Sequence, residues 1–349
     1  MANRYWVGKG GTWDATTTTN WSATSGGSSG ASAPTSADSV FINQAQAMTI
    51  TISGTASCLD LTDTNTLAHS FAGTGVLNIS GSMTLSTTTT WSGTGAITFK
   101  ATTTGKTITP NGVTISGAIT FDGVGGAWSL GGALTMASGK SITLTNGTLD
   151  LNGKTCTTGT NFTTATGTKD LTFNAGTLVC PAASATAFNN AVPTGFTITA
   201  GTGVGVISMT AATAKTFVGG GSTFNCTLQN AGAGALTITD SNTFTNISNS
   251  VQPTTFTFTA GTTTTVTNWN INGTAGNLVT IGSATGASHT LSKASGTVNS
   301  NYLSISRSTA TGGATWNAGA NSTDGGNNSG WIFSAPPPAT ATGNFLVFF

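Results

Sequence analysis

Charged side chains are scarce in this sequence of 349 residues. Lysine, arginine, aspartate and glutamate together make up 5% of it, whereas about 25% is usual for a soluble domain. Glutamate is absent, so all nine acidic residues are aspartates, and the net charge is +1. The sequence has no basic stripe that could neutralise a phosphate backbone, which excludes nucleic acid as a partner. It also lacks a run of about 18 apolar residues, so no membrane span is predicted.

The residue types that most often carry chemistry are equally few. The two histidines, His69 and His289, lie far apart in the sequence, and no Gly-x-Ser-x-Gly elbow occurs in a strand-to-helix context. Glycoside hydrolysis needs two carboxylates that flank the scissile bond. The best local pair is Asp60 and Asp63, but residues three apart on a strand face opposite sides. We therefore predict that the chain is not an enzyme, and we assign no catalytic residue and no cofactor.

The cysteines give no sign of a metal site. Cys58, Cys156, Cys180 and Cys226 are spaced unlike any Cys-x-x-Cys metal motif. Cys156 and Cys180 are separated by about the length of one repeat, so they could lie in neighbouring repeats. We expect all four to be small apolar core residues.

What the sequence has in abundance is threonine, with 76 residues, and glycine, with 48. Threonine favours strands because its branched Cβ suits a pleated surface, and glycine suits tight corners. An apolar-Thr-apolar unit recurs every 19 to 29 residues if a looser copy at Phe217-Val218 is included. The other copies begin at Ile97, Ile119, Ile142, Leu171, Phe196, Leu236 and Phe256.

This recurrence predicts an all-β fold of stacked repeats. Alternating apolar and polar residues indicate strands with one buried face, and a period in this range is typical of solenoids. We predict a parallel β-helix, or β-solenoid, with about 20–25 residues per coil and a cap at each end. The alternative is a series of β-sandwich or jelly-roll domains. Asn-Gly pairs such as Asn111-Gly112 and Asn152-Gly153 keep it open, because they suit antiparallel hairpins.

Four segments follow from the changes in composition. Residues 1–48 form an aromatic-rich N-terminal cap or docking unit, and residues 49–300 carry the solenoid repeats. Residues 301–333 form a C-terminal cap, and residues 334–349 form a proline-rich linker with an apolar docking tail.

Aromatic residues at the two ends are the candidate interaction sites. A solenoid must protect its terminal coils, so tryptophans there suit a cap or an assembly contact. Stacking on a carbohydrate is the alternative for the N-terminal group. An apolar terminus left in water promotes association, so we expect the tail to insert into a groove of a partner or of another copy. The candidates are Tyr5, Trp6, Trp13, Trp21, Trp316, Trp331, Phe345, Leu346, Phe348 and Phe349.

One loop has the oxygen ligands that Ca²⁺ prefers. Aspartate, asparagine and serine cluster around Asp324, within Asp324–Trp331. Because the loop contains a single carboxylate, we interpret it as a turn and assign no metal ligand.

Two stretches resemble a known group of proteins. The opening Asn3-Arg4-Tyr5-Trp6-Val7-Gly8 precedes Gly11-Thr12-Trp13-Asp14, and the ending joins Gly312–Trp316 to Asp324–Phe333. These stretches resemble Gly/Thr-rich β-repeat proteins on the virion exterior of tailed bacteriophages, and the closing motif also resembles parts of large bacterial surface proteins. The resemblance implies capsid decoration, a head fibre or a tail fibre. It implies no catalytic residue.

We therefore predict a non-enzymatic structural protein that docks onto major capsid or tail proteins. The resemblance implies a homo-oligomer, with a trimer as a common form. The first residues lack the apolar core of a signal peptide, so we expect synthesis in the host cytoplasm and a final place on the virion exterior. An extracellular or bacterial surface location is the alternative. A tailspike that recognises or cleaves a host-surface polysaccharide and a fragment of a bacterial adhesin are the alternative functions.

Overall fold

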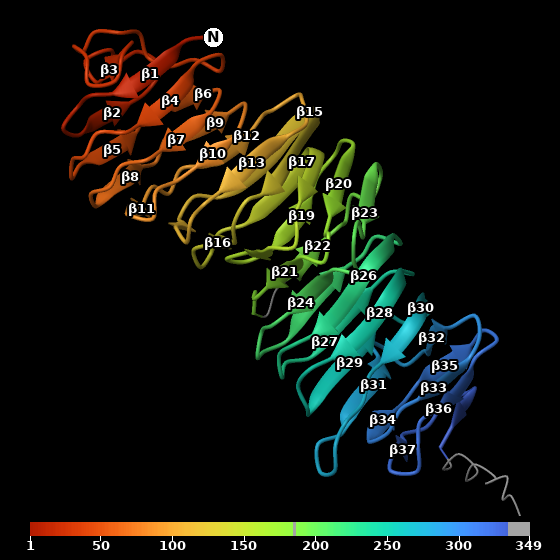
Figure 1. Cartoon of the computed structure of the whole chain (residues 1–349). Helices are drawn as coiled ribbons and strands as arrows, with labels where there is room; N and C mark the ends of the chain where they lie inside the picture. The colour runs from red at the N-terminus through yellow and green to blue at the C-terminus, as the bar shows by residue number, and fades with distance from the viewer. Residues whose placement is uncertain (184–185, 334–349) are drawn as a thin grey trace, which may run out of the picture.

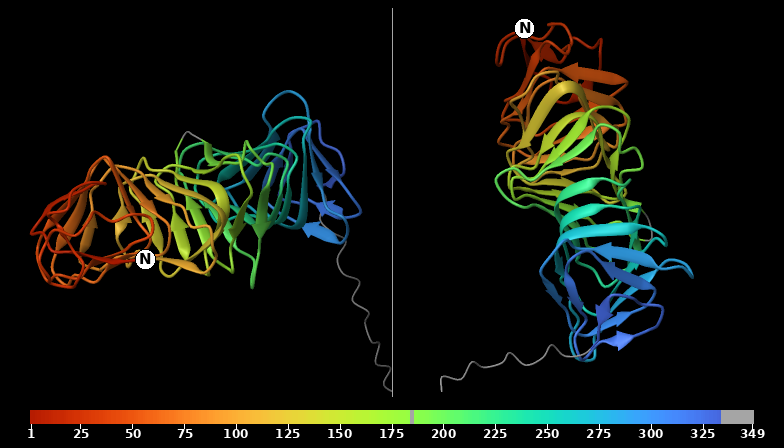
Figure 2. Two further views of the ribbon diagram at one scale, coloured as in Figure 1. Left: turned by 90° about the horizontal axis from the view of Figure 1, so that it is seen from above. Right: turned by 90° about the vertical axis from the view of Figure 1, so that its right-hand side faces the viewer.

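The computed structural model describes residues 1–183 and 186–333. Within these ranges the chain forms strands and no helix, and hence no helix that could cross a bilayer. The strands are stacked along one axis, with the N-terminus at one end and the last described coils at the other (Figure 1). Two further views show the same elongated body (Figure 2). It is a parallel β-helix of about 13 turns, which confirms the predicted fold class.

Three ladders of parallel strands run along the body. Ladder A contains β1 (Asn3–Trp6), β4 (Ser39–Ile42), β7 (Leu61–Asp63), β10 (Met83–Thr84), β13 (Lys106–Thr109), the second half of β15 (Ile119–Leu130), the second half of β17 (Ile142–Asp150), β20 (Lys169–Thr172) and β23 (Phe196–Thr199).

Ladder B contains β6 (Thr55–Cys58), β9 (Val76–Ile79), β12 (Ile97–Phe99), the first halves of β15 and β17, β19 (Phe162–Thr164), β22 (Thr186–Asn189), β25 (Lys215–Val218), β27 (Leu236–Thr239), β29 (Thr254–Phe258), β31 (Val279–Ser283), β34 (Leu303–Ile305) and β37 (Thr323–Asp324).

Ladder C contains β2 (Gly11–Trp13), β5 (Thr49–Ile52), β8 (His69–Gly73), β11 (Thr89–Trp91), β14 (Thr114–Ile115), β16 (Leu134–Met136), β18 (Thr155–Thr157), β21 (Thr177–Cys180), β24 (Val206–Met209), β26 (Thr223–Asn230), β28 (Thr243–Asn249), β30 (Thr263–Asn270), β32 (His289–Ser292) and β35 (Ser308–Thr311). A small sheet of β33 (Thr297–Asn299), β36 (Thr315–Asn317) and β38 (Trp331–Ile332) closes the C-terminal end.

Each coil satisfies the backbone of its neighbours. The amide of Leu77 donates to the carbonyl of Ala96 at 2.9 Å, and the amide of Ile97 donates to the carbonyl of Ala118 at 2.9 Å. Because each coil pairs with the coil before it and the coil after it, exposed strand edges remain only at the two ends. These parallel pairings also overturn the sandwich alternative. Asn111 and Asn152, with φ of 51° and 49°, turn corners between parallel strands.

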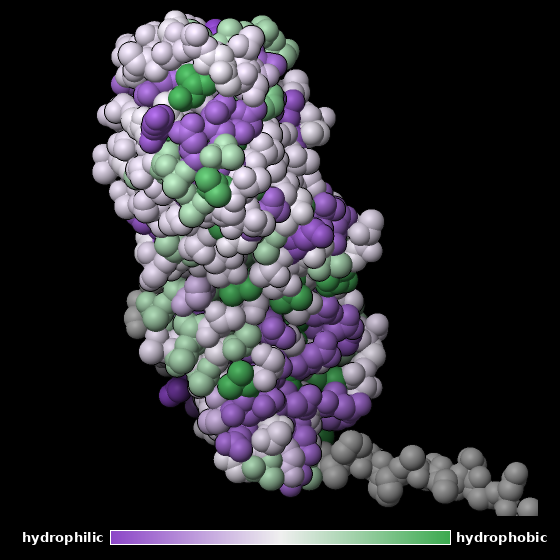
Figure 3. Space-filling model, turned by 60° about the vertical axis from the view of Figure 1, so that its left-hand side comes forward, coloured by the Kyte–Doolittle hydropathy of each residue, from purple (hydrophilic) through white to green (hydrophobic). Residues whose placement is uncertain are grey.

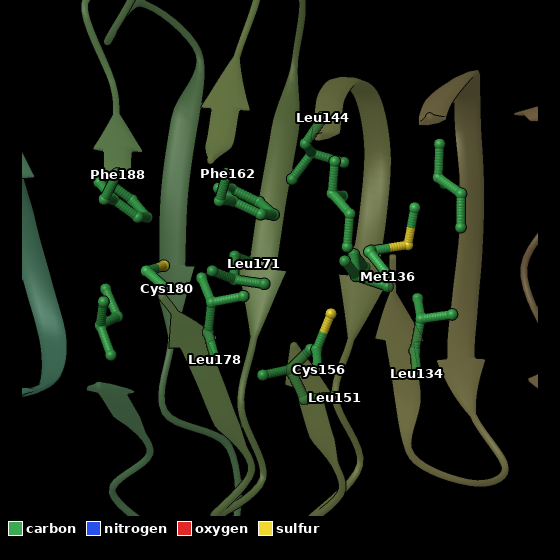
Figure 4. Close-up of a cluster of buried hydrophobic side chains, with 14 of the residues drawn as sticks. Leu134, Met136, Leu144, Leu151, Cys156, Phe162, Leu171, Leu178, Cys180 and Phe188 are labelled. Carbon is green, nitrogen blue, oxygen red and sulfur yellow. The ribbon is translucent and has the colours of Figure 1, made fainter. Parts of the chain in front are cut away.

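The core consists of like residues stacked on like. The rings of Phe162 and Phe188 stack with centroids 5.6 Å apart, and Phe188 stacks on Phe217 at 4.7 Å. In a second row, Leu134 pairs with Cys156, and Cys156 pairs with Leu178. Figure 4 shows Phe162 and Phe188 of the first row, and all three residues of the second, in the coil interior. Strand alternation therefore explains which residues are inside.

The repeat unit seen in the sequence does not follow a single ladder. The copies at Ile97, Ile119 and Ile142 do pair in succession on ladder B. The next residue of that row, however, is Phe162, whereas Leu171 and Phe196 lie on ladder A. The expected coil length is also exceeded, because Phe162 pairs with Phe188 and Phe188 pairs with Phe217. Those two steps are 26 and 29 residues long.

Glycine makes one of the corners tight. A Cβ on Gly95 would lie 1.8 Å from the carbonyl oxygen of Gly75, and a Cβ on Gly117 would lie 2.0 Å from that of Gly95. No side chain fits at such a distance, so successive coils approach each other there through bare backbone.

The two predicted caps are continuous with the coils. Within residues 1–48, β1 pairs in parallel with β4 and β2 pairs in parallel with β5. The strand that differs is β3 (Trp21–Ser22), which pairs antiparallel with β1. It covers the edge of ladder A that would otherwise face solvent.

The stacked phenylalanines make a prediction about stability. We expect Phe217→Ala to destabilise the protein by about 3–5 kcal/mol, because it leaves a cavity between the Phe188 ring and Ile238. Thr216→Ala, on the outward face of the same strand, should change stability by less than about 0.5 kcal/mol. Urea unfolding followed by circular dichroism measures both, and equal effects would contradict the row of stacked rings.

Candidate functional site

The tryptophans of the N-terminal end form a closed cluster. Trp6, Trp13 and Trp21 are each 0% exposed. The Trp21 ring meets the Trp6 ring at 5.0 Å and 90°, and the Trp13 ring at 5.3 Å and 73°. Such edge-to-face contacts are favourable beyond the area they bury. The three rings fill the interior of the first coil where no earlier coil exists to fill it.

The C-terminal end is closed in the same way. Trp269 meets Trp316 at 5.7 Å and 70°, and Trp316 meets Trp331 at 5.1 Å and 68°. Trp316 and Trp331 are buried, and their indole nitrogens donate to the Thr311 carbonyl and to the Ser308 hydroxyl. Each end of the solenoid therefore has a plug of three tryptophans.

This burial concerns half of the residues that the sequence offered as interaction candidates. Five of the candidate residues, Trp6, Trp13, Trp21, Trp316 and Trp331, have no ring face open to a partner or to a sugar in the single chain. The cap interpretation accounts for their burial, and their role in an assembly contact stays a prediction. Tyr5 is half-buried and stacks on Phe41 at 5.0 Å. Phe345, Leu346, Phe348 and Phe349 lie outside the described residues.

The loop at Asp324 is held as a turn. The Asp324 Oδ1 atom accepts hydrogen bonds from the Gly326 amide at 2.9 Å and from Asn328 Nδ2 at 2.6 Å. Within residues 1–183 and 186–333, no group of three or more histidine, cysteine or acidic side chains could hold a metal ion. One carboxylate that already accepts two hydrogen bonds is a turn cap of the usual kind.

Asp60 and Asp63 face opposite sides, as their spacing predicts. Asp60 points outward and accepts hydrogen bonds from the Ser39 hydroxyl and the Ser82 amide. Asp63 is 1% exposed and points into the coil. The two carboxylates therefore do not flank a common substrate position.

Asp63 belongs to a buried polar cluster that the sequence did not predict. His69 Nε2 lies 2.9 Å from Asp63 Oδ2, and the Thr89 hydroxyl donates to the same oxygen at 2.5 Å. Asp63 and His69 lie on the two sides of the corner between β7 and β8, and Thr89 lies on β11, which pairs with β8 one coil further on. Burial favours the neutral imidazole, but hydrogen bonds to Asp63 and to the Leu67 carbonyl outweigh it and raise the pKa of His69 above its ordinary value.

The cluster lacks the geometry of a nucleophile activated by a base. In a catalytic triad the carboxylate binds one ring nitrogen and the nucleophile binds the other. Here both Asp63 and Thr89 face Nε2 of His69, while Nδ1 lies 2.9 Å from the Leu67 carbonyl. Thr89 gives its hydrogen to Asp63, so the ring has no free nitrogen with which to take that proton. The arrangement ties two neighbouring coils together.

His289 is buried without such partners. It is 0% exposed, its ring stacks on Phe258 at 4.6 Å, and neither ring nitrogen has a hydrogen-bond partner in the described chain. Burial lowers the pKa of His289 to about 4. The ring is therefore neutral at pH 7 and acts as part of the apolar core.

Two lysines are also inside. Lys215 Nζ donates to the carbonyls of Ala211 and Gly234, each at 2.8 Å, and burial lowers its pKa to about 8. Lys169 Nζ donates to the Thr194 carbonyl at 2.9 Å, and burial lowers its pKa too. Backbone carbonyls at the coil corners, instead of carboxylates, satisfy both ammonium groups.

A sequence signal for these buried groups existed. On a strand, residues two apart share a face. Lys169 precedes Leu171 by two positions, and Lys215 precedes Phe217 in the same way. His69 stands two positions before Phe71 and His289 two before Leu291, so alternation places all four ionisable side chains inside.

The four cysteines are free and buried. Burial raises the pKa of the Cys156 thiol to about 12 and moves the pKa values of Cys58, Cys180 and Cys226 in the same direction. Thiols with such high pKa values are poor nucleophiles, which agrees with the predicted core role.

Comparison with protein-family models, with curated proteins and with solved structures found no match to this chain.

His289 makes the stability depend on pH. The folded chain keeps this ring neutral down to about pH 4, whereas the unfolded chain protonates it near 6.5. Between these values the unfolded chain binds more protons, so lowering the pH should destabilise the protein, by about 3 kcal/mol at most. Urea midpoints measured from pH 7 to pH 4.5 test this.

The matched control is His289→Phe, which keeps a ring and removes the titration. It should lose less stability than the unmodified chain over the same pH range. His69 acts in the opposite direction, because its raised pKa gives stability that is lost as the pH rises. An equal pH dependence of the His289→Phe variant and the unmodified chain would contradict the account of His289.

Proposed function

We propose that this chain is a non-enzymatic structural protein of a tailed-phage virion exterior, serving as capsid decoration or as a fibre. The observation that carries the proposal is a rod of stacked coils whose two ends are both plugged by tryptophans. Such a rod is rigid along its axis because continuous strand ladders join each coil to the next one. Because the chain's own side chains fill its interior, such a rod suits an element that projects from a particle and keeps its shape without another protein.

The outward surface supports the same function. On ladder B, Thr98, Thr120, Thr143 and Thr163 form one outward row across four coils. In the described ranges the ion pairs are the buried His69–Asp63 contact and the exposed Lys100–Asp122 contact at 3.9 Å. A hydroxyl surface with so little charge resists nonspecific electrostatic binding, which is useful for an element exposed on a particle.

The resemblance to phage proteins supports the proposal from another direction. The stretches that carry it include Trp6, Trp13, Trp316 and Trp331, which are four of the six residues in the two end plugs. Docking is assigned to the apolar tail at Asn344–Phe349, since the tryptophans are enclosed. The partners are major capsid or tail proteins and other copies of this chain.

A receptor-binding tailspike is the second candidate. The observation that favours it is a groove lined by amide side chains on the flank of the C-terminal coils, at Asn272, Asn301 and Asn321. A decoration protein needs no such groove. A bacterial adhesin fragment would share the fold but would be found on a cell surface instead of on a particle.

A cryo-EM map of the particle that carries this chain tests the proposal. We expect a narrow rod that projects from the icosahedral shell or from the tail, with its base formed by residues near the C-terminal tail. Absence of this chain from the virions of the phage that encodes it would overturn the phage function. A rod at the tail tip with its flank free would favour receptor binding.

Deleting Asn344–Phe349 tests the docking role separately. We expect the shortened chain to fold as before and to be lost from purified particles, because the tail supplies the apolar contact area. A variant with residues 339–343 replaced by a Gly/Ser sequence of equal length is the control and should remain on the particle. Full occupancy of the shortened chain would contradict docking through the tail.

A further inference from the structure

Four asparagines form a continuous ladder on the outside of the C-terminal coils. The Oδ1 atom of Asn249 accepts from the Asn272 amide at 3.1 Å, that of Asn272 accepts from the Asn301 amide at 2.9 Å, and that of Asn301 accepts from the Asn321 amide at 3.1 Å. Asn249 is the last residue of β28, and the other three lie in corners that lead to the next strand of ladder B. We call this row the asparagine ladder.

The ladder fixes the orientation of its side chains. Because Oδ1 of Asn272 and of Asn301 is held by a backbone amide, the Nδ2 group of each is the end left for other contacts. Neither Nδ2 group has a hydrogen-bond partner among the described residues, and the Asn321 side chain makes no hydrogen bond there. The ladder therefore presents amide groups at the coil repeat, about 4.8 Å apart.

A hollow lies beside the ladder. Its volume is about 570 Å³, and it is lined by Asn272, Asn301 and Asn321 together with Asn299 and Asn317. Asn317 Nδ2 donates to Asn299 Oδ1 at 3.0 Å. This bond leaves Oδ1 of Asn317 as an acceptor and Nδ2 of Asn299 as a donor. The hollow, which we call the amide groove, thus offers both donors and acceptors. Figure 3 shows hydrophilic side chains gathered over the C-terminal coils on the face it displays.

The lining determines which ligand chemistry fits. It includes no lysine, arginine or acidic side chain, so a phosphate, sulfate or carboxylate ligand would remain unneutralised. It includes no large apolar side chain either, so an apolar peptide would gain little. Amides donate and accept at once, which matches hydroxyl groups because they do the same.

The repeat determines the shape of the ligand. Donors spaced by one coil suit a chain whose hydroxyl groups recur at a similar distance, and a pyranose unit in an extended polysaccharide advances by about that distance. We propose that the amide groove binds a neutral polysaccharide that lies along the solenoid axis. This inference does not rest on the proposed phage function, because it concerns only the groove and its ligand.

The affinity should be modest for a single groove. No aromatic ring lines it, so hydrogen bonds carry the binding without the stacking that strengthens many sugar sites. Several copies on one particle or cell surface would raise the overall avidity without new contacts.

The test uses the full chain and three neutral hexasaccharides: cellohexaose, maltohexaose and chitohexaose. Saturation-transfer NMR and titration should show that at least one binds with a millimolar Kd. Asn301→Asp keeps the oxygen that accepts from the Asn321 amide but replaces the free Nδ2 donor with a carboxylate oxygen. Binding should fall by about tenfold or more with this variant, as expected for a lost hydrogen bond whose partner is left unpaired.

Two further variants keep the result interpretable. Asn321→Ala removes a side chain that makes no hydrogen bond within the described chain, so it should leave the unfolding midpoint unchanged and weaken binding. Asn246→Asp changes a half-buried asparagine outside the groove, whose Oδ1 accepts from Asn268 at 2.8 Å and whose Nδ2 donates to the Thr227 hydroxyl at 2.8 Å, and it should bind as the unmodified chain does.

Three results would overturn the proposal. The first is that none of the three hexasaccharides binds at millimolar concentration. The second is that binding survives unchanged in both Asn301→Asp and Asn321→Ala. The third is that inorganic sulfate or a sulfated saccharide competes more strongly than the neutral hexamers, which would assign the groove to anions.

Discussion

The structure depends on the parallel hydrogen bonds that join each coil to the next. They satisfy the backbone of every strand and leave edges only at the ends, which is the constraint that a solenoid must meet. Once strands are aligned, alternation points every second side chain inward, and these side chains form one hydrophobic core. Coil length varies at the corners and at bulges within strands, such as the one between Thr186 and Phe188. The corner at Gly75, Gly95 and Gly117 shows how closely successive coils can approach, because backbone contacts backbone there.

The same constraint explains the buried ionisable residues. Alternation drives Lys169, Lys215, His69 and His289 inward whatever their chemistry, and the fold then satisfies each in a different way. The lysines use carbonyls at the corners, where coil turns leave acceptors facing inward. His69 is held by Asp63, and His289 stays neutral against Phe258. None of the four is arranged as a reactive group.

The ends and the flanks have different roles. At both ends tryptophan triads complete an interior that has no neighbouring coil, which is why rings that resemble binding residues are enclosed. On the flanks the surface is largely hydroxyl and amide. The asparagine ladder differs from the threonine rows because Oδ1 of Asn272 and of Asn301 accepts from a backbone amide, while the Nδ2 group of each has no partner among the described residues. The binding that we propose therefore lies on the flank of the C-terminal coils, while the tryptophans fill the interior at the ends.

The sequence alone determined the fold class, because an apolar-Thr-apolar alternation repeated at solenoid spacing has few other solutions. It also determined which side chains point inward, since alternation is a local property of a strand. Only the tertiary structure decided which copies share a ladder: Leu171 and Phe196 fall on ladder A because the lengths of the corners, which alternation does not encode, set the register. For the same reason the structure alone revealed that the terminal tryptophans are plugs. It alone brought Asp63, His69 and Thr89 together, and it alone aligned Asn249, Asn272, Asn301 and Asn321. Each of these groups joins different coils, and contacts between coils depend on every corner that separates them.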